Sequence, residues 1–455
     1  MKRSLLALCL ATGAFNTLAQ QQIGIATDNY NTINSLYLNP ANLGACKEKL
    51  AINFFSFGMG VDNNLGKLAS FSDVSSGAGS GTFKLDGGTG KFDMTVPSIE
   101  MRGPSLLYRI NRKHAVALTT RVRAFNQFSN FDKSLYLSIT DPSSINTAAV
   151  GYNASNFNWT AHIWTETGLS YGGEVFSTDM FSVKVGATLR YLSGIGYVGF
   201  KGRNMDVNYT AANDSFSANN TNVEFATNIN AIDESLAENI ASRLTGSKEG
   251  AKGIGADLGA VFTYKKSPED DDYTGLFSIA IRDLGSITYK TSTFVTVAGT
   301  GSFKGSELDG NVDNYQKFRN FALSKGFTVD TGTASRKVYM PTTIMVGADY
   351  KAYKRIYVSA TFIGNMTSTA NFGSKYYTQL TITPRLQTKV FTAALPLTFN
   401  SITNNLRVGM ALRAYCFYVG SDDMMGLFAS GYGANFYSGV MLPIYKKPRN
   451  RGGNN

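Results

Sequence analysis

Apolar and polar side chains alternate along several segments of this chain, in stretches of about 10 to 15 residues. In the clearest segment, five apolar residues oppose four polar or small ones: Val183, Val185, Ala187, Leu189 and Tyr191 against Lys184, Gly186, Thr188 and Arg190. Segments beginning at Ile254, Ile356 and Leu406 repeat the pattern. Period-two alternation indicates strands with two different faces, and many such strands are typical of a barrel between lipid and a lumen. The chain is therefore predicted to be all-β, a transmembrane antiparallel β-barrel.

The composition agrees with this prediction. Charged residues make up 16% of the chain, against about 25% in a typical soluble domain, and aromatic residues make up 12%. Beyond the N-terminus, no run of about 18 apolar residues could form a membrane-spanning helix. A membrane form of this chain must therefore be a closed barrel, since only helices and barrels satisfy their backbone in hydrocarbon. A β-sandwich adhesin is the competing soluble fold.

Twelve core strands are predicted, and hairpins within two long insertions would raise the number to fourteen. The predicted strands lie near 50–59, 96–110, 114–127, 158–175, 180–197, 251–266, 274–290, 336–351, 355–366, 377–399, 404–420 and 428–446. Short connections, among them 400–403, alternate with long ones, as in barrels with short periplasmic turns and long outer loops. The insertions, 201–250 and 291–335, are predicted to be extracellular and to carry amphipathic helices at about Ile229–Leu244 and Val312–Leu323. They are interpreted either as paired lids over one mouth or as ordinary packed loops.

The N-terminal segment predicts export. Lys2 and Arg3 precede a short apolar core and a small residue, Ala19, so residues 1–19 read as a signal peptide. Residues 20–49 then form an N-terminal hatch or plug, 50–446 the barrel, and 447–455 a basic tail. The predicted location is the outer membrane, in contact with its lipid, with both termini in the periplasm. Export argues against a nucleic-acid partner despite the formal charge of +11.

The hatch is expected to centre on Tyr37–Gly44, here called the plug motif. Asn39 can cap a helical turn with its side-chain oxygen, and Pro40 suits the first helical position. Ala41 follows in the turn, and Gly44 can end it in a left-handed conformation. An ordinary loop turn is the simpler interpretation of these residues.

The inward face of the predicted strands is rich in cations. The expected lumen and ligand-binding residues are Arg121, Arg123, Lys184, Arg190, Arg282, Arg385, Arg407 and Arg413. A smaller acidic set, including Glu166, Asp257 and Asp349, faces them. These cations could attract an anionic ligand by focusing the field in a narrow passage, or they could pair with strand neighbours and with hatch carboxylates such as Asp28.

The sequence contains few candidate catalytic residues. His114 and His162 are the only histidines, and His162 lies beside Trp159 and Trp164, where a membrane-interface position is expected. The glycines of Gly253–Gly259 alternate along a strand and open no helix, which argues against a dinucleotide loop and favours a plug approaching the wall. No enzyme activity, metal or cofactor is predicted.

The export signal, the plug motif and the strand pattern together resemble the fatty-acid-transporter-like (FadL-like) outer-membrane barrels. Further stretches that carry the resemblance are Ile281–Gly285, Thr383–Arg385, Gly420–Asp423 and Gly439–Tyr445. It is strongest with a little-characterised Bacteroidetes branch, related in style to barrel proteins of type IX secretion. The resemblance implies a hatch, a fourteen-stranded wall and transport. The tail after Tyr445 departs from the aromatic end of many such barrels.

The expected function is passive uptake or capture of small hydrophobic or amphipathic molecules, the ligand being hydrophobic or anionic. The alternative is a non-transport adaptor or structural protein for secretion or surface attachment, with a secretion-system or surface protein as its partner. A pocket beside the plug motif favours transport, whereas a sealed lumen favours the adaptor.

Overall fold

The computed structural model describes residues 22–68, 83–85, 90–140, 149–228, 251–270, 272–311, 315–368, 371–403, 405–424 and 431–445. The predicted signal peptide, the helix at Ile229–Leu244 and the tail 447–455 lie outside the described residues. The helices are α2 (Ile23–Ala26), α3 (Thr32–Leu36), η2 (Pro40–Ala45), α5 (Lys133–Thr140), η4 (Ala211–Asn213), η5 (Gly305–Leu308) and α7 (Tyr315–Ser324). In the described part of the chain, no helix is long and apolar enough to cross a membrane.

Nearly every other described segment is a strand. The first half of the chain contributes β1 (Leu50–Asn63), β2 (Gly66–Leu68), β3 (Phe83–Leu85), β4 (Lys91–Arg102), β5 (Ser105–Arg109), β6 (His114–Asp132), β7 (Ala149–Asn153), β8 (Phe157–Ser177), β9 (Phe181–Thr210) and β10 (Ser215–Thr227). The second half contributes β11 (Lys252–Tyr264), β12 (Gly275–Lys304), β13 (Thr328–Tyr339), β14 (Thr343–Tyr353), β15 (Ile356–Asn365), β16 (Gln379–Gln387), β17 (Phe391–Ala394), β18 (Leu397–Asn400), β19 (Leu406–Val408), β20 (Met410–Ala414), β21 (Phe417–Ser421) and β22 (Gly433–Ile444).

All strands except β2 and β3 belong to one antiparallel sheet of twenty segments that closes on itself. The closure joins the two ends of the wall, with Leu50 of β1 opposite Ile444 of β22 and Asp62 opposite Gly433. Six strands of the wall are broken in two (β4/β5, β7/β8, β10/β11, β13/β14, β17/β18 and β19/β20), so the barrel has fourteen strands. The closed wall confirms the predicted barrel and excludes the β-sandwich.

The thirteenth and fourteenth strands arise where the sequence predicted two single strands. Segments 377–399 and 404–420 are each a hairpin, turning after Gln387 and at Tyr415–Cys416. These tight turns hold no Gly, Pro or Asn, and Tyr415 itself takes the left-handed φ of 51°. The predicted short turn at 400–403 therefore lies at the long-loop end. The insertions add no strand to the count, contrary to the expectation.

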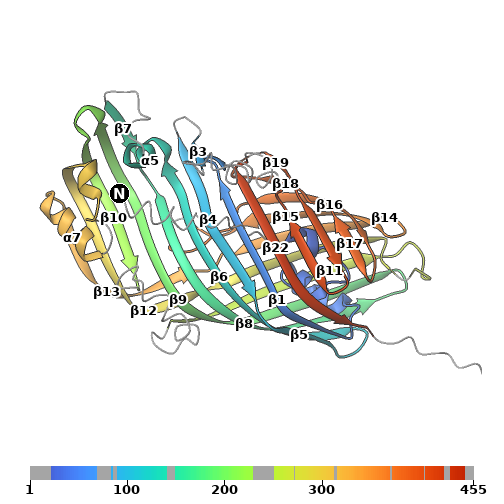
Figure 1. The fold of residues 1–455 in the computed structure, drawn as a ribbon. Helices are drawn as coiled ribbons and strands as arrows, with labels where there is room; N and C mark the ends of the chain where they lie inside the picture. The colour runs from blue at the N-terminus through green and yellow to red at the C-terminus, as the bar shows by residue number, and fades with distance from the viewer. Residues whose placement is uncertain are drawn as a thin grey trace, which may run out of the picture.

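The two insertions are mostly continuations of the wall. Residues 201–210, 215–227, 291–304 and 328–335 belong to β9, β10, β12 and β13, which pair with one another. β9 and β12 have 30 residues each, about three times the 9 to 11 that span a bilayer. Figure 1 shows these strands reaching far beyond the short strands β15–β20. The described residues of the insertions therefore form mainly a tall wall. Among them, α7 matches the helix predicted at Val312–Leu323 and begins at Tyr315.

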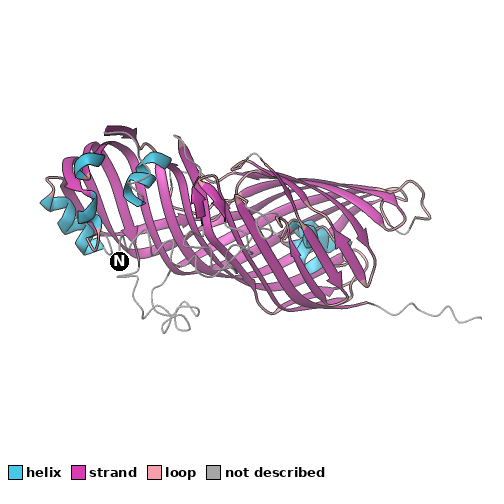
Figure 2. Cartoon of the chain, turned by 45° about the horizontal axis from the view of Figure 1, so that its top comes forward, coloured by secondary structure: helices cyan, strands magenta, loops and turns pink. Residues whose placement is uncertain are grey.

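An apolar belt surrounds the half of the barrel near the short turns. Leu106, Leu118, Leu169 and Leu189 face outward in direct register across four neighbouring strands, and they are 46% to 64% exposed. Tyr108 and Tyr171, also exposed, lie nearer the turns. An exposed apolar band with an aromatic edge is the lipid-facing surface of a transmembrane barrel. The hatch helices lie within this half of the barrel (Figure 2).

Beyond the belt, the same wall carries a second core on its outer face. Along β6 and β8, Arg121, Arg123 and Trp164 point into the lumen, whereas Phe128 and Trp159, which pair across the strands, point the opposite way by alternation. Phe128 and Trp159 are nonetheless 5% and 7% exposed. They are buried in an apolar cluster that includes Tyr136 of α5, and Phe131 and Phe200 pack both against this cluster and against a second one that includes Ala322 of α7. Both helices lie at the long-loop end (Figures 1 and 2).

Candidate functional site

The plug motif forms the predicted capped turn inside the barrel. Asn39 has extended backbone and accepts a 2.9 Å hydrogen bond from the Ala41 N–H, and Pro40 begins the 3-10 helix η2. The Asn39 side-chain amide also donates to the backbone carbonyls of Ala260 and Ile279, both at 3.1 Å. Asn39 therefore caps its own helix and holds that helix to two wall strands.

Three glycines of the wall form the surface against which η2 packs. Gly172, Gly186 and Gly259 lie side by side on β8, β9 and β11. A β-carbon on Gly186 would lie 2.4 Å from the Pro40 carbonyl oxygen, and one on Gly259 would lie 2.0 Å from Asn39 Oδ1. We call Gly172, Gly186 and Gly259 the glycine row. It explains Gly259, one of the alternate glycines of β11, as a surface for close approach of the hatch, whereas β-carbons at Gly253 and Gly255 would meet the backbone of β12.

Gly44 differs from its prediction. It lies within η2 and does not take the left-handed conformation expected of a terminating glycine. A β-carbon at Gly44 would lie 3.0 Å from the Gly173 carbonyl carbon and 3.2 Å from the Lys184 β-carbon. Small size, and not backbone freedom, is therefore what this position requires, because the wall approaches it closely.

Carboxylates fasten the hatch elsewhere. Asp422, which follows β21, accepts hydrogen bonds from the N–H groups of Ile23 and Gly24 at 2.7 and 2.9 Å and so caps α2. The Asp28 carboxylate lies 2.5 Å from Nε of Arg413 on β20, and both are buried. Asp28 and Arg413 thus form the hatch pair that the structural interpretation of the sequence expected.

A third carboxylate, that of Glu48, accepts a 2.7 Å hydrogen bond from the Thr32 hydroxyl and so joins the end of the hatch to α3. Neither Asp422 nor Glu48 was singled out from the sequence as a site residue. No local pattern marks them, because each finds its partner only when the chain folds back on itself.

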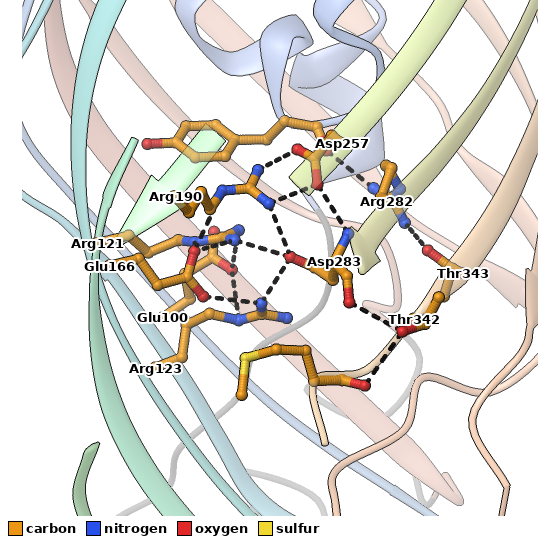
Figure 3. Close-up of polar contacts among 12 residues, drawn as sticks. Glu100, Arg121, Arg123, Glu166, Arg190, Asp257, Arg282, Asp283, Thr342 and Thr343 are labelled. Carbon is orange, nitrogen blue, oxygen red and sulfur yellow. Dashed lines mark hydrogen bonds and ion pairs between the residues drawn. The ribbon is translucent and has the colours of Figure 1, made fainter. Parts of the chain in front are cut away.

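On the long-loop side of the hatch, the lumen holds a compact layer of charged side chains, here called the charge layer (Figure 3). Asp283 contacts three arginines: Arg121, Arg123 and Arg190, at 3.2, 3.0 and 3.2 Å. Glu166 contacts the same three, at 2.6, 3.1 and 3.4 Å. The remaining members are Arg102, Arg282, Glu100 and Asp257, which pairs with Arg190. Because these side chains are buried, each charge depends on the opposite charges beside it for its stability.

Asp283 could not be predicted from alternation. Adjacent residues of a regular strand point to opposite faces, yet Arg282 and Asp283 are both buried in the lumen, at 4% and 6% exposure. Asp283 has a left-handed φ of 54°, and the pairing with β11 shifts register between Ala256 and Leu258. Such a bulge re-aims a side chain, and it brings Asp283 into the charge layer.

The hatch contacts this layer through Tyr37. The Tyr37 carbonyl accepts a 2.9 Å hydrogen bond from Arg282, and the guanidinium carbons of Arg102 and Arg121 lie 4.2 and 4.9 Å from the centre of its ring. Cations over an aromatic face are attracted to it. The hatch and the charge layer therefore form one connected structure.

The eight predicted cations do not form a single site. Arg121, Arg123, Arg190 and Arg282 meet in the charge layer. The other arginines bind carboxylates at separate points: Arg385 with Asp349, Arg407 with Asp62 and Asp423, and Arg413 with Asp28. Lys184 alone of the eight lies beneath Gly44 and is bonded to hydroxyl groups.

Farther toward the long-loop end than the charge layer, the segment 371–378 between β15 and β16 folds into the lumen. Lys375 exchanges backbone hydrogen bonds with the Gln127 side chain at 2.6 and 2.7 Å, and the Tyr376 hydroxyl accepts one from Arg123. His162 and Trp164 are fully buried here, stacked at 4.5 Å, with His162 bonded to the Tyr289 hydroxyl. The predicted membrane-interface position is therefore wrong for these two residues, because their strand face is the lumen.

An apolar cavity of about 240 Å³ lies at the long-loop end. Ten phenylalanines and Trp159 contribute to its lining, together with aliphatic residues of β9, β10 and α7. Of the described residues that line it, Asp309 alone is charged. Because Phe128 and Trp159 line it, this cavity lies on the opposite face of the wall from the charge layer. Sequence alternation marks these faces but does not show that helices cover one of them.

A second cavity, of about 410 Å³, lies beside the hatch at the short-turn end and is lined by many hydroxyl side chains. The Cys46 thiol nearby is buried, and this burial, reinforced by Glu48, raises its pKa to about 12. Among the described residues, no group of His, Cys, Asp and Glu is arranged to hold a metal ion.

Fold and site together define a transmembrane β-barrel whose lumen holds an N-terminal segment and a charge layer. The chain belongs to a family of unknown function (DUF5723), whose pattern matches residues 40–422. Among curated proteins, none matches the chain.

Solved structures of similar architecture include hydrocarbon channels. A deltaS2 mutant of the monoaromatic hydrocarbon channel TodX is 9% identical, with a TM-score of 0.47, covering 93% of this chain and 98% of that one. The toluene transporter TbuX of Ralstonia pickettii is 13% identical, with a TM-score of 0.42 and coverage of 90% and 94%. A Pseudomonas aeruginosa FadL homologue is 11% identical, with a TM-score of 0.43 and coverage of 94% and 99%.

Proposed function

We propose that this protein is an outer-membrane barrel that captures small, uncharged apolar molecules in the cavity at its long-loop end, for passive uptake. The observation that carries the proposal is the cavity lining, which is mostly aromatic and aliphatic, with Asp309 as the single charge among its described residues. The apolar belt supports membrane insertion, and the even strand number leaves both ends of the described chain at the short-turn side. That side is assigned to the periplasm.

The cavity size suggests the ligand class. An apolar cavity of about 150 Å³ stays dry and takes up benzene, and typical drug-sized ligands need about 300 Å³ or more. At about 240 Å³, this cavity suits a one-ring hydrocarbon or a short alkyl chain. Among the described lining residues there is no cation to pair with a carboxylate, and Asp309 would repel one. This narrows the hydrophobic or anionic ligand expected from the sequence to a neutral one for this cavity.

Binding can be tested with the full chain in detergent micelles. Trp159 lines the cavity and Trp164 faces the lumen, so a Trp164→Phe variant leaves Trp159 as the single reporter. Toluene is expected to change Trp159 fluorescence saturably, while benzoate, the same ring with a carboxylate, is not. Equal binding of benzoate would contradict the assignment to a neutral ligand.

A cavity-filling variant locates the site. Ala322 of α7 is buried at the cavity, and Ala322→Phe is expected to abolish toluene binding by occupying its space. Ala187→Phe, on the lipid-facing side of β9, is the matched control and should bind as the unmodified chain does. Unchanged toluene binding by Ala322→Phe would show that the cavity is not the site. Flux into proteoliposomes, measured with the same variants, then tests uptake separately from capture.

The packed lumen supports a second candidate, a non-transport adaptor for secretion or surface attachment. Hatch, charge layer and segment 371–378 occupy successive levels of the lumen. An adaptor would leave proteoliposomes carrying the unmodified chain no more permeable to toluene or small solutes than empty ones, even where capture is intact.

A further inference from the structure

The hydroxyl-lined cavity at the short-turn end has a different chemistry from the apolar cavity. It lies between the hatch and the wall, and its volume is about 410 Å³. Lys184 lines it and is 93% buried, since only 7% of the residue is exposed. The inference that follows concerns this cavity alone and does not depend on the capture of apolar molecules.

Lys184 sits in a small triangle of donors. Its ammonium group donates to Ser182 Oγ at 2.6 Å and to Thr263 Oγ1 at 3.3 Å, and the two hydroxyls lie 2.6 Å apart. An ammonium has three N–H donors and each hydroxyl has one O–H. The three contacts use two N–H groups and one O–H, so one N–H and one O–H remain. Two adjacent donors match the two oxygens of a carboxylate.

The neighbouring carboxylates are engaged with other cations. Glu174 lies opposite Lys184 across the strand pair, and its Oε1 is 3.2 Å from Lys113 Nζ. Asp28, Asp272 and Asp349, which also line the cavity, pair with Arg413, Lys47 and Arg385. Within the described part of the chain, Lys184 has no carboxylate within ion-pair distance.

A second lining lysine adds positive charge. Lys265 Nζ donates to the backbone carbonyl of Asp270. At the rim, Arg112 and Asp179 are exposed and of opposite charge. Each interior carboxylate thus has a cation of its own, and among the described residues Lys184 and Lys265 are the interior lining cations without a carboxylate in an ion pair, which favours an anion.

The rest of the lining is suited to hydroxyl groups. Thr32, Ser35, Ser278 and Thr361 line the cavity, as does Ser359 of β15. The Ser359 hydroxyl is buried and has no hydrogen-bond partner among the described residues. A buried polar group without a partner is costly, so Ser359 points to a partner that arrives with a ligand.

We propose that this cavity binds a small hydroxylated carboxylate, of the sugar-acid class. Its carboxylate accepts hydrogen bonds from the Lys184 ammonium and the Ser182–Thr263 hydroxyl pair, and its hydroxyl groups bond to Ser359 and the neighbouring threonines. The site lies at the opposite end of the barrel from the apolar cavity and on the lumen side of the wall. It gives this end of the barrel a selectivity for polar anions.

Calorimetric titration of the full chain in detergent tests this with three probes at constant ionic strength. D-Gluconate carries both features, hexanoate carries only the carboxylate, and sorbitol carries only the hydroxyls. Gluconate is expected to bind most tightly. Lys184→Met is expected to weaken gluconate binding by about tenfold or more, as loss of a charge-assisted hydrogen bond does. Ser359→Ala should weaken gluconate binding by a smaller factor and leave hexanoate unchanged.

The controls separate this site from general effects. Lys337→Met removes an exposed lysine from β13 and should leave gluconate binding unchanged. Thr263→Val, nearly isosteric, provides a second variant should Lys184→Met fail to fold, and is expected to weaken binding several-fold. Gluconate that does not bind, binds equally to Lys184→Met and Thr263→Val, or binds no better than sorbitol or hexanoate would overturn the proposal. Toluene binding should be unchanged in Lys184→Met, so the two proposals can fail separately.

Discussion

The side-chain oxygen of Asn39 lies only 2.0 Å from the position that a β-carbon on Gly259 would take. The hatch therefore rests on the wall at a place where no side chain fits. Because Asn39 also donates to the Ala260 and Ile279 carbonyls, any displacement there would break hydrogen bonds to two strands.

Gly259→Ala is consequently expected to loosen the hatch. The added methyl group must push Asn39 away, at the cost of about 1 to 3 kcal/mol for overpacking and of the Asn39 hydrogen bonds. Hydrogen exchange of the backbone amides in 32–45 should become faster by one to two orders of magnitude. Gly275→Ala, where a β-carbon meets nothing within 4 Å, is the control. Equal protection in both variants would show that the glycine row does not hold the hatch.

The glycine row also shows which features of the fold could be predicted from the sequence and which could not. Alternation identified β11, its lumen face and a reason for its glycines, because period two is a local property of a strand. For Gly259, however, the residue that it meets, Asn39, lies more than 200 positions away in the chain. Local patterns could therefore predict a plug near the wall but not its contacts.

The charge layer, too, could be predicted only in part from the sequence. Alternation correctly turned Arg121, Arg123 and Arg190 inward, whereas Asp283 enters through a bulge with a left-handed backbone. The apolar cavity was missed for a related reason. Phe128 and Trp159 alternate as lipid-facing residues would, and only the packing of α5 and α7 shows that they are covered.

The pair Asp28–Arg413 should act as the main ionic link between hatch and wall. Breaking a buried pair by removing one partner costs about 3 to 5 kcal/mol, because the other charge stays buried. Asp28→Asn is therefore expected to release the hatch from β20. The paired variant Asp28→Asn with Arg413→Met should recover part of the loss, which a double-mutant cycle measures.

Cys46 offers a built-in reporter of this release. Its thiol is buried with a pKa raised to about 12, so little thiolate forms at neutral pH and maleimide should react slowly. Cys416, half-buried in the turn after β20, provides the internal comparison. Labelling of Cys46 should accelerate in Asp28→Asn while that of Cys416 stays within about twofold. A Cys46 rate unchanged by Asp28→Asn would mean that the ion pair does not restrain the hatch.

Glu166 is expected to be the most sensitive acid of the wall. It contacts Arg121, Arg123 and Arg190 and also accepts a 2.7 Å hydrogen bond from the Trp164 indole. Glu166→Gln removes a charge that three buried arginines share, so a loss of at least about 3 kcal/mol in unfolding free energy is expected.

Glu174 on the same strand is the matched control for Glu166. It pairs with Lys113, whose side chain is 58% exposed, and exposed pairs contribute about 0 to 1 kcal/mol. Glu174→Gln should accordingly change the midpoint of urea unfolding little. Similar losses in the two variants would argue that the charge layer contributes no special stability.

The contact between Lys47 and Asp272 should make hatch attachment depend on pH. Burial acts to raise the pKa of Asp272, but the Lys47 ammonium at 2.5 Å and hydrogen bonds from Lys47 and Tyr357 lower it below its ordinary value. A carboxyl group whose pKa is lowered by folding stabilises the folded state above its ordinary pKa, which for Asp is about 3.9. That contribution is lost as the pH falls through the lowered value.

Lys47→Met should therefore lower the melting temperature at pH 7, by an amount corresponding to at most about 1 kcal/mol for this partly exposed pair, and the difference should shrink at a pH below the ordinary Asp value of about 3.9. Lys49→Met is the control, because Lys49 donates at 2.6 Å to the backbone carbonyl of Arg109, which does not titrate. Its effect should be the same at both pH values. A Lys47→Met difference that persists in acid would show that Lys47 stabilises the hatch through packing against Tyr30, over whose ring it lies at 4.4 Å, and not through the charge of Asp272.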